Sequence, residues 1–247
     1  MAAEEFIFGI HAVTALLQQA PQRIVRVYLQ QGRADQRLQQ IMELLAKHHV
    51  ESEQKPRHEL DAMVVDEQHQ GVVARCIVQK SYHEADIDVL LDEITTPPFL
   101  LILDGVQDPH NLGACLRSAN AAGVHMVIAP RDRSVGLTPA VRKVACGAAE
   151  ITPFIQVTNL ARTLQMLKDR GIWLYGTDSA AQSSLFQTNL NGAVGLVLGA
   201  EGTGLRRLTA ELCDGLMSIP MIGAVESLNV SVATGICLYE VLRQRMK

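Results

Sequence analysis

The chain has 247 residues, with 48% hydrophobic and 19% charged side chains, and 26 acidic residues against 22 basic ones. This length and composition suit one large or two modest globular domains and exclude an extensively disordered protein. The longest apolar stretches, such as 99–103 and 195–200, are far too short to span a bilayer, and the first residues lack the basic and apolar regions of a signal peptide. We therefore expect a soluble, cytoplasmic protein with no membrane partner.

The cysteines and the net charge narrow the possible sites. The five cysteines are dispersed, with no C-x-x-C pair and no histidine at metal-ligand spacing. We expect apolar core residues in a reducing cytoplasm rather than disulfides or zinc ligands. They are Cys76, Cys115, Cys146, Cys213 and Cys237. Because the net charge is −4, any binding of RNA must use local basic patches rather than the overall field.

The N-terminal third reads as short alternating helices and strands. Apolar periodicity predicts helices over 9–19 and 38–47 and strands over 24–29 and 71–78. The segment that follows, 79–98, carries five acidic residues and ends in two prolines, which cannot continue a helix. We interpret 1–78 as a domain and 79–98 as a linker with one short helix around 87–94.

From residue 99 onward, strands are separated by helices of ten or more residues. The stretch 99–103 is continuously apolar, which is typical of a strand buried on both faces of a parallel sheet. Further strands are predicted over 125–129, 173–176, 193–198 and 216–219, and helices over 111–122, 159–169 and 229–243. This alternation predicts an α/β domain over 99–247, with a mostly parallel sheet covered by helices on both faces.

Three loops at the carboxyl ends of predicted strands have unusual compositions, and ligands collect at such loops. The first, 104–113, enters a helix for which Asn111 is a well-placed N-cap. Arg117 falls on the polar face of this helix, which is otherwise poor in charge. The alternative interpretation is a capped helix with a solvated arginine. Asp104 and Asp108 alone are weak support for a metal site, and we expect no metal.

The second and third loops combine glycines with polar side chains. Residues 199–204 contain three glycines around Glu201, which allows close backbone approach to a ligand but also suits a plain turn. The glycine order differs from a dinucleotide fingerprint, and no P-loop motif is present. The third loop leads from Ile219 to Ser227 or Asn229, one of which begins an otherwise apolar helix. Capping explains some of its polar residues, but we favour a polar pocket.

Together, the three segments resemble those of the SpoU (TrmH-type) ribose 2′-O-methyltransferases of the knotted SPOUT superfamily. The matching segments are Asp104-x5-His110-Asn111-Leu-Gly-Ala-Cys-Leu-Arg117, then Leu198-Gly-Ala-Glu201-Gly-x-Gly204, then Ile219-Pro-Met and Ser227-Leu-Asn229-Val-Ser-Val-Ala. The N-terminal part is similar through Phe8-Gly-Ile-His-Ala-Val13 and His69-Gln-Gly71. Within the family, the resemblance points to members that methylate a guanosine of 23S rRNA.

The resemblance implies a C-terminal domain with a deep trefoil knot, a small N-terminal RNA-binding domain similar to ribosomal protein L30e, and a homodimer. It implies S-adenosylmethionine as the cofactor, held in the knot by the loops at Gly199, Ile219 and Leu228. The implied reaction is methyl transfer to a ribose 2′-hydroxyl in 23S rRNA. Arg117 matches the family's catalytic arginine, and the other polar positions of the motifs are matched by Asn111, Glu201, Ser227 and Asn229.

Binding of RNA also requires positive charge near the motif loops. Three basic pairs flank them and are candidate phosphate contacts, although each pair alone is more often solvated. They are Arg131 with Arg133, Arg142 with Lys143, and Arg206 with Arg207. Glu226 departs from the family's usual small polar residue and is expected to add negative charge near the RNA side.

Two alternatives stay open. One is a tRNA ribose methyltransferase of the same family, and the other is a non-catalytic RNA-binding or ribosome-assembly protein. The N-terminal extension favours the ribosomal substrate over tRNA. The matching set of polar residues favours an enzyme over a binding protein.

Overall fold

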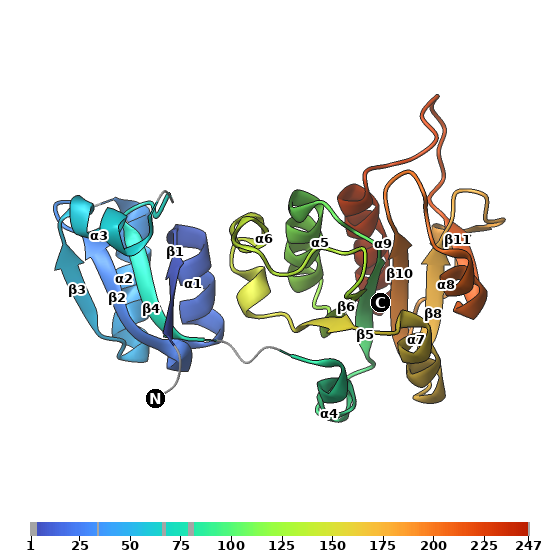
Figure 1. The fold of residues 1–247 in the computed structure, drawn as a ribbon, viewed down its shortest axis with the longest axis horizontal. Coiled ribbons are helices and arrows are strands. Elements are labelled where there is room, and N and C mark those ends of the chain that lie inside the picture. The colour runs from blue at the N-terminus through green and yellow to red at the C-terminus, as the bar shows by residue number, and fades with distance from the viewer. Residues whose placement is uncertain (1–3, 34, 66–67, 79–81, 247) are drawn as a thin grey trace. The chain divides into compact units, whose positions relative to one another are not determined.

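The computed structural model describes residues 4–33, 35–65, 68–78 and 82–246. The chain divides into two compact units, one of Met1–Lys80 with Cys146–Ile151 and one of Ser81–Ala145 with Thr152–Lys247. Each unit is built on its own sheet (Figure 1). The site described below lies in the second unit.

The first unit is a four-stranded sheet with the strand order β1-β4-β2-β3. Neighbouring strands are antiparallel except β2 and β3, which are parallel. Its elements are β1 (Glu4–Phe8), α1 (Ile10–Gln19), β2 (Ile24–Gln30), α2 (Gln36–His48), β3 (Ser52–Lys55), α3 (Arg57–Met63) and β4 (Val72–Ile77). The predicted helices are present as α1 and α2 and the predicted strands as β2 and β4.

The sequence did not predict β1, β3 or α3. The reason is clearest for β3, which reads Ser-Glu-Gln-Lys and has no apolar alternation. It becomes a strand through its parallel pairing with β2. The core of the unit forms where the apolar stripe of α1, with Val13, Leu16 and Leu17 fully buried, packs with α2 and the sheet.

The second unit is a seven-stranded sheet with the order β7-β6-β5-β10-β8-β11-β9, and its neighbouring strands pair in parallel. Its strands are β5 (Phe99–Asp104), β6 (Met126–Pro130), β7 (Phe154–Val157), β8 (Trp173–Thr177), β9 (Ser183–Ser184), β10 (Val194–Gly199) and β11 (Gly215–Ser218). Its helices are α4 (Ile87–Asp92), α5 (Pro109–Ala121), α6 (Pro139–Ala145), α7 (Leu160–Asp169), α8 (Arg207–Leu212) and α9 (Val230–Arg245). The predicted α/β class with a mostly parallel sheet is confirmed.

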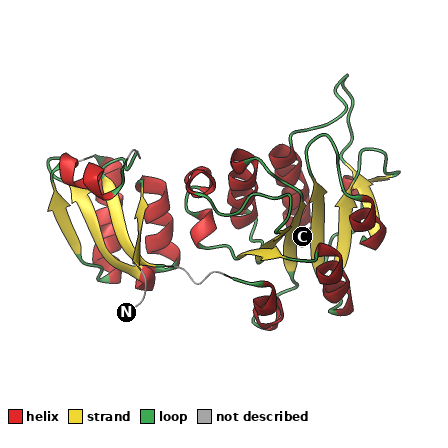
Figure 2. Cartoon of the chain, viewed as in Figure 1, coloured by secondary structure: helices red, strands yellow, loops and turns green. Residues whose placement is uncertain are grey.

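Helices cover both faces of this sheet (Figure 2). Helix α5 packs with α6 and α9, and α7 packs with α8. Helices α4 and α7 supply apolar side chains, among them Ile87 and Leu164, to a core that includes Leu100 and Ile102 of β5. Every residue of β5 is buried, as its continuous apolar sequence predicts.

Several elements of the second unit were not predicted, among them α6, β7, β9 and α8. Short 3₁₀ helices occur in both units, at Pro21–Arg23 and Ala148–Glu150 in the first and at Glu84–Asp86 and Leu185–Gln187 in the second. The short helix predicted around 87–94 is present as α4, and its Ile87 and Leu91 are buried in the core of the second unit.

No helix in the described part of the chain is both long enough and apolar enough to cross a membrane. The five cysteines are free thiols, of which Cys76, Cys115 and Cys237 are buried. Burial raises the pKa of Cys115 to about 11 and that of Cys237 to about 12. These thiols therefore act as small core residues rather than as nucleophiles.

Candidate active site

The three motif loops meet at the carboxyl edge of the parallel sheet because β5 and β10 are neighbours. Asp104, the last residue of β5, lies in register with Gly199, the last residue of β10. The loop after β5 therefore starts beside the glycine-rich loop after β10. The loop after β11 leads into α9, which packs on α5 and β10 and so returns to the same edge.

Asn111, Glu201 and Asn229 come together from these three loops. The Nδ2 of Asn229 donates to Oδ1 of Asn111 at 2.9 Å and to Oε2 of Glu201 at 3.3 Å. The Nδ2 of Asn111 donates to the same Glu201 oxygen at 3.4 Å. One carboxylate is thus held by two neutral amides that come from the starts of two helices.

The position of Asn111 corrects one prediction. The N-cap of α5 is Asp108, whose carboxylate accepts from the backbone N–H groups of His110 and Asn111, each at 3.2 Å. The physical reason is Pro109, which suits the first helical position and so places the cap one residue before it. Since Asp108 caps the helix, the amide of Asn111 is available to reach Glu201 and Asn229.

Asn229 is the N-cap of α9, as the third motif suggested. Its Oδ1 accepts from the backbone N–H of Ser231 at 2.9 Å and from the Ser231 hydroxyl at 2.6 Å. Because the oxygen faces the helix, the amide nitrogen faces Asn111 and Glu201. Capping of α9 and assembly of the polar cluster therefore use opposite ends of one amide.

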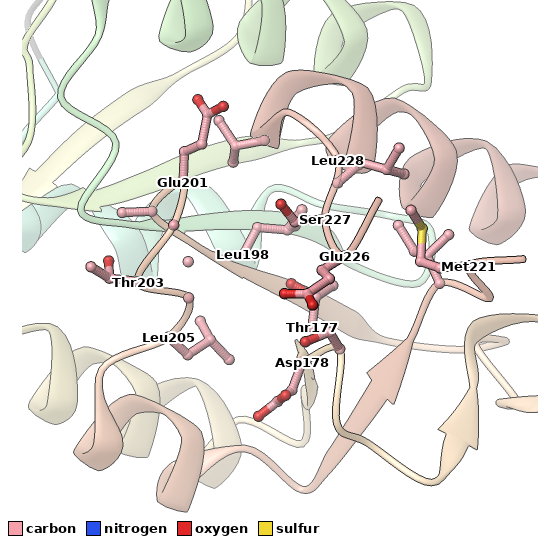
Figure 3. A pocket seen from close by; sticks show the side chains of 18 of the residues that line it. Thr177, Asp178, Leu198, Glu201, Thr203, Leu205, Met221, Glu226, Ser227 and Leu228 are labelled. Atoms are coloured by element: carbon pink, nitrogen blue, oxygen red, sulfur yellow. The ribbon is translucent and has the colours of Figure 1, made fainter. Parts of the chain in front are cut away.

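A pocket of about 410 Å³ adjoins this cluster, and Glu201 belongs to both (Figure 3). Its walls combine apolar side chains, exposed backbone of the glycine-rich loop, and hydroxyl and carboxylate groups. Of the predicted site residues, Gly199, Glu201, Ile219, Ser227 and Leu228 line the pocket. Thr177 and Asp178 also line it, and no motif indicated them. Thr177 and Asp178 follow β8, so only their position at the end of a predicted strand could have indicated them.

Gly199 is required by the fold of the glycine-rich loop. A Cβ at this position would lie 2.1 Å from the carbonyl carbon of Gly204 and 2.3 Å from the backbone nitrogen of Leu205. The loop is closed on itself, since the N–H of Gly204 donates to the carbonyl of Ala200 at 2.9 Å. The glycines of this segment therefore serve a compact loop that presents Glu201.

A buried ion pair fixes the end of the same loop. The side chain of Asp104 is 0% exposed, and its Oδ1 lies 2.5 Å from a terminal nitrogen of Arg206 and accepts from Nε at 2.7 Å. Its Oδ2 accepts from the backbone N–H of Arg206 at 3.2 Å. Arg206 was a candidate phosphate contact, but its guanidinium has this internal partner. The same contacts give both carboxylate oxygens of Asp104 a partner within the protein.

The other polar residues singled out in the sequence differ in their surroundings. Arg117 is exposed on α5 and does not line the pocket. Thr234, one of the polar residues taken as a sign of a pocket, is buried, and its hydroxyl donates to the carbonyl of Val230 at 2.7 Å. Glu226, which we expected near the RNA side, is among the residues that line the pocket.

The fold agrees with the comparisons to known families. The model of the family described as "SpoU rRNA Methylase family" matches residues 98–239, and the model described as "RNA 2'-O ribose methyltransferase substrate binding" matches residues 6–80. The chain belongs to the SpoU rRNA methylase family, and the resemblance seen in its three motifs is confirmed.

Individual proteins are similar along nearly the whole chain. A protein of Coxiella burnetii named 23S rRNA (guanosine-2′-O-)-methyltransferase RlmB is 56% identical over 245 residues, which is 99% of this chain and 98% of that protein. A crystal structure of an RNA 2′-O ribose methyltransferase matches with a TM-score of 0.77 and 25% identity, covering 99% of this chain and 90% of that one. The fold is also shared with the SpoU methyltransferase AviRb of Streptomyces viridochromogenes in complex with AdoMet, with a TM-score of 0.75 and 22% identity over 98% of this chain and 91% of that one.

Proposed function

We propose that this protein transfers a methyl group from S-adenosylmethionine to the ribose 2′-hydroxyl of a guanosine in 23S rRNA. The observation that carries the proposal is the cluster of Asn111, Glu201 and Asn229 at the rim of the pocket. The name of the 56% identical Coxiella burnetii relative, which matches 99% of this chain, supports the substrate class.

The pocket fits the proposed cofactor in size and chemistry. Its volume of about 410 Å³ lies within the range of roughly 300–1,000 Å³ that is usual for small-molecule sites. Leu198, Leu205 and Leu228 offer apolar surface to an adenine, and the loop at Gly199 and the residue Ile219 offer backbone donors and acceptors. S-adenosylmethionine supplies a methyl group that its sulfonium has already activated.

The protein's own residues then have to orient and polarise the acceptor. A ribose hydroxyl is a poor nucleophile, so the site must align its oxygen with the methyl group and stabilise the charge that develops there. A guanidinium does not give up its proton readily, and we therefore assign Arg117 to hold the RNA phosphate and the 2′-oxygen. Asn111, Glu201, Ser227 and Asn229 orient the ribose and Arg117.

The finer architecture belongs to the same proposal. We propose domains over 1–78 and 99–247 joined by a linker over 79–98, with the first domain L30e-like and the second tied in a deep trefoil knot. The mixed four-stranded sheet supports an L30e-like domain. The return of α9 from the loop after β11 to pack on α5 and β10 supports the knot.

We also propose a homodimer that acts in the cytoplasm. Helix α9 exposes an apolar stripe at seven-residue spacing, with Val232 at 50%, Tyr239 at 51% and Met246, its C-cap, at 78% exposure. Such a stripe suits helix-to-helix packing between two copies. Light scattering of the wild type and of Tyr239→Glu tests this, and we expect the substitution to shift the protein towards a monomer.

The experiment that tests the reaction is transfer of tritium from labelled S-adenosylmethionine to unmodified 23S rRNA and to bulk tRNA, side by side. We expect label in the rRNA, alkali-resistant at one guanosine, and none with Arg117→Ala although that variant still binds the cofactor. Label only in tRNA would overturn the substrate. Loss of folding or of cofactor binding in Arg117→Ala would overturn the role of that residue, and a wild type that binds no cofactor would overturn the enzyme itself.

A further inference from the structure

The wall of the pocket carries negative charge without a compensating positively charged side chain. Three of its residues, Asp178, Glu201 and Glu226, are acidic, and none of the residues that line it in the described part of the chain is Lys, Arg or His. Glu201 is held by the amides of Asn111 and Asn229, which are neutral. The pocket therefore presents three carboxylates and no cation to whatever it binds.

Two of these carboxylates are outside the polar cluster. Asp178 follows β8 and accepts a backbone N–H from Ala180 at 2.8 Å. Glu226 comes from the loop between β11 and α9, and within the described residues its carboxylate has no hydrogen-bond or ion-pair partner. Figure 3 shows Glu226 near the middle of the pocket, with Thr177 and Asp178 beside it. Two separate loops thus direct negative charge at the same space.

The proposed cofactor and its product differ mainly in charge. S-adenosylmethionine carries a sulfonium cation, whereas S-adenosylhomocysteine, which remains after methyl transfer, carries an uncharged thioether. The adenine, the ribose and the amino-acid part are the same, so apolar and backbone contacts bind both molecules about equally. A carboxylate discriminates between them, because it attracts the charged form and has no such attraction for the thioether.

We propose that Glu226, together with Asp178, makes this pocket select the positively charged methyl donor over its uncharged product. This inference rests on the proposed function and adds to it a determinant of cofactor specificity that also limits product inhibition. Substitution of Glu226 is the sharper test, because within the described residues its carboxylate has no hydrogen-bond or ion-pair partner, whereas that of Asp178 accepts from the N–H of Ala180. The pocket thereby gives Glu226 a partner in the cofactor rather than in the RNA.

The test is to measure, by calorimetry, the dissociation constants of S-adenosylmethionine, S-adenosylhomocysteine and sinefungin. Sinefungin carries an amine that restores the positive charge without a transferable methyl group. The proteins compared are the wild type, Glu226→Gln and Glu93→Gln. Glu93 is an exposed residue of the same unit that does not line the pocket, so its substitution is a control for net charge. Asp178→Asn is measured as the second variant.

We expect Glu226→Gln to raise the dissociation constants of S-adenosylmethionine and sinefungin by about two- to fivefold, which is the effect of one exposed ion pair. Its affinity for S-adenosylhomocysteine should stay unchanged, and Glu93→Gln should change none of the three. Raising the salt concentration should reduce the preference of the wild type, because the screening length falls to about 3 Å at 1 M. Asp178→Asn should have the same pattern as Glu226→Gln.

Equal weakening of all three ligands would overturn the proposal, since it would assign Glu226 to a charge-independent contact. Weakening of S-adenosylmethionine alone, with sinefungin unaffected, would overturn it as well, because the methyl group rather than the charge would then be sensed. If the wild type bound none of the three ligands, the proposed function itself would fail. That outcome is distinct from a failure of discrimination.

Discussion

The ion pair of Asp104 and Arg206 gives the sharpest prediction about stability. The carboxylate is 0% exposed and the guanidinium 46% exposed, so the two partners are not equivalent. Arg206→Ala leaves a buried carboxylate with one remaining donor, the backbone N–H of residue 206. Breaking a buried pair from one side costs about 3–5 kcal/mol, and we expect about 3 kcal/mol here because water can enter from the exposed side.

The reverse substitution should be milder. Asp104→Asn keeps the shape and one acceptor, and the released guanidinium can turn to water, so we expect a loss of about 1 kcal/mol. In the double variant the buried group is a neutral amide that needs no counter-charge. The double variant should therefore be more stable than Arg206→Ala alone, although it carries one substitution more.

The free energy of unfolding is measured by urea titration with circular dichroism and with the fluorescence of Trp173. This is the single tryptophan of the chain, and it lies in the second unit. The control is Arg207→Ala, which removes a neighbouring charge whose ion pair with Glu211, at 3.7 Å, is exposed. If Arg206→Ala left the free energy of unfolding unchanged within about 0.5 kcal/mol but weakened RNA binding, Arg206 would be a phosphate contact and our reasoning would be refuted.

Three further predictions concern the loops and one histidine. Gly199→Ala should abolish cofactor binding in calorimetry, because its Cβ would lie 2.1 Å from a backbone atom of the same loop. Gly223→Ala, whose Cβ would meet nothing within 4 Å, should bind the cofactor normally. Equal binding by the two variants would contradict the requirement for glycine at position 199. Asn229→Ser keeps a capping oxygen for α9 but loses the donor to Glu201 without adding charge, so methyl transfer should fall while the melting temperature hardly changes. Unchanged transfer would remove the cluster from catalysis. Burial lowers the pKa of His125 below 6.5, so its stabilising contribution is complete above pH 6.5 and is lost as the pH falls through the lowered folded-state pKa. The free energy of unfolding of His125→Asn should therefore depend less on pH in that window, and an identical pH dependence would contradict the assignment.

The sequence predicted those parts of the fold in which local pattern and tertiary environment agree. The strand at 99–103 was recognisable because burial on both faces demands an unbroken apolar run. Strand β3 was missed because its residues are polar, and helix α6 because Pro139 to Ala145 is too short to establish a period. In both elements, pairing or packing with distant residues decides the structure.

The candidate site was predictable as a set of loops but not as a geometry. The motifs indicated Asn111, Glu201 and Asn229 separately, and only the placement of β10 beside β5 brings them into contact. Glu226 was expected near the RNA side, and its position in the chain does not reveal that its side chain lines the pocket. Asp178 was missed altogether, since no motif surrounds it.

The side-chain amide of Asn229 caps α9 with its oxygen and holds Glu201 with its nitrogen. Rotating it by half a turn would set its nitrogen against the backbone N–H of Ser231 and its oxygen against the carboxylate of Glu201. Both changes replace attraction by repulsion, so the observed orientation is favoured; loss of the cap alone costs about 1 kcal/mol. Glu201 is therefore held in place without a ligand, as the preorganised site of the proposed methyl transfer requires. A residue that caps a helix and also holds the carboxylate of Glu201 therefore sets the geometry of this cluster as the chain folds.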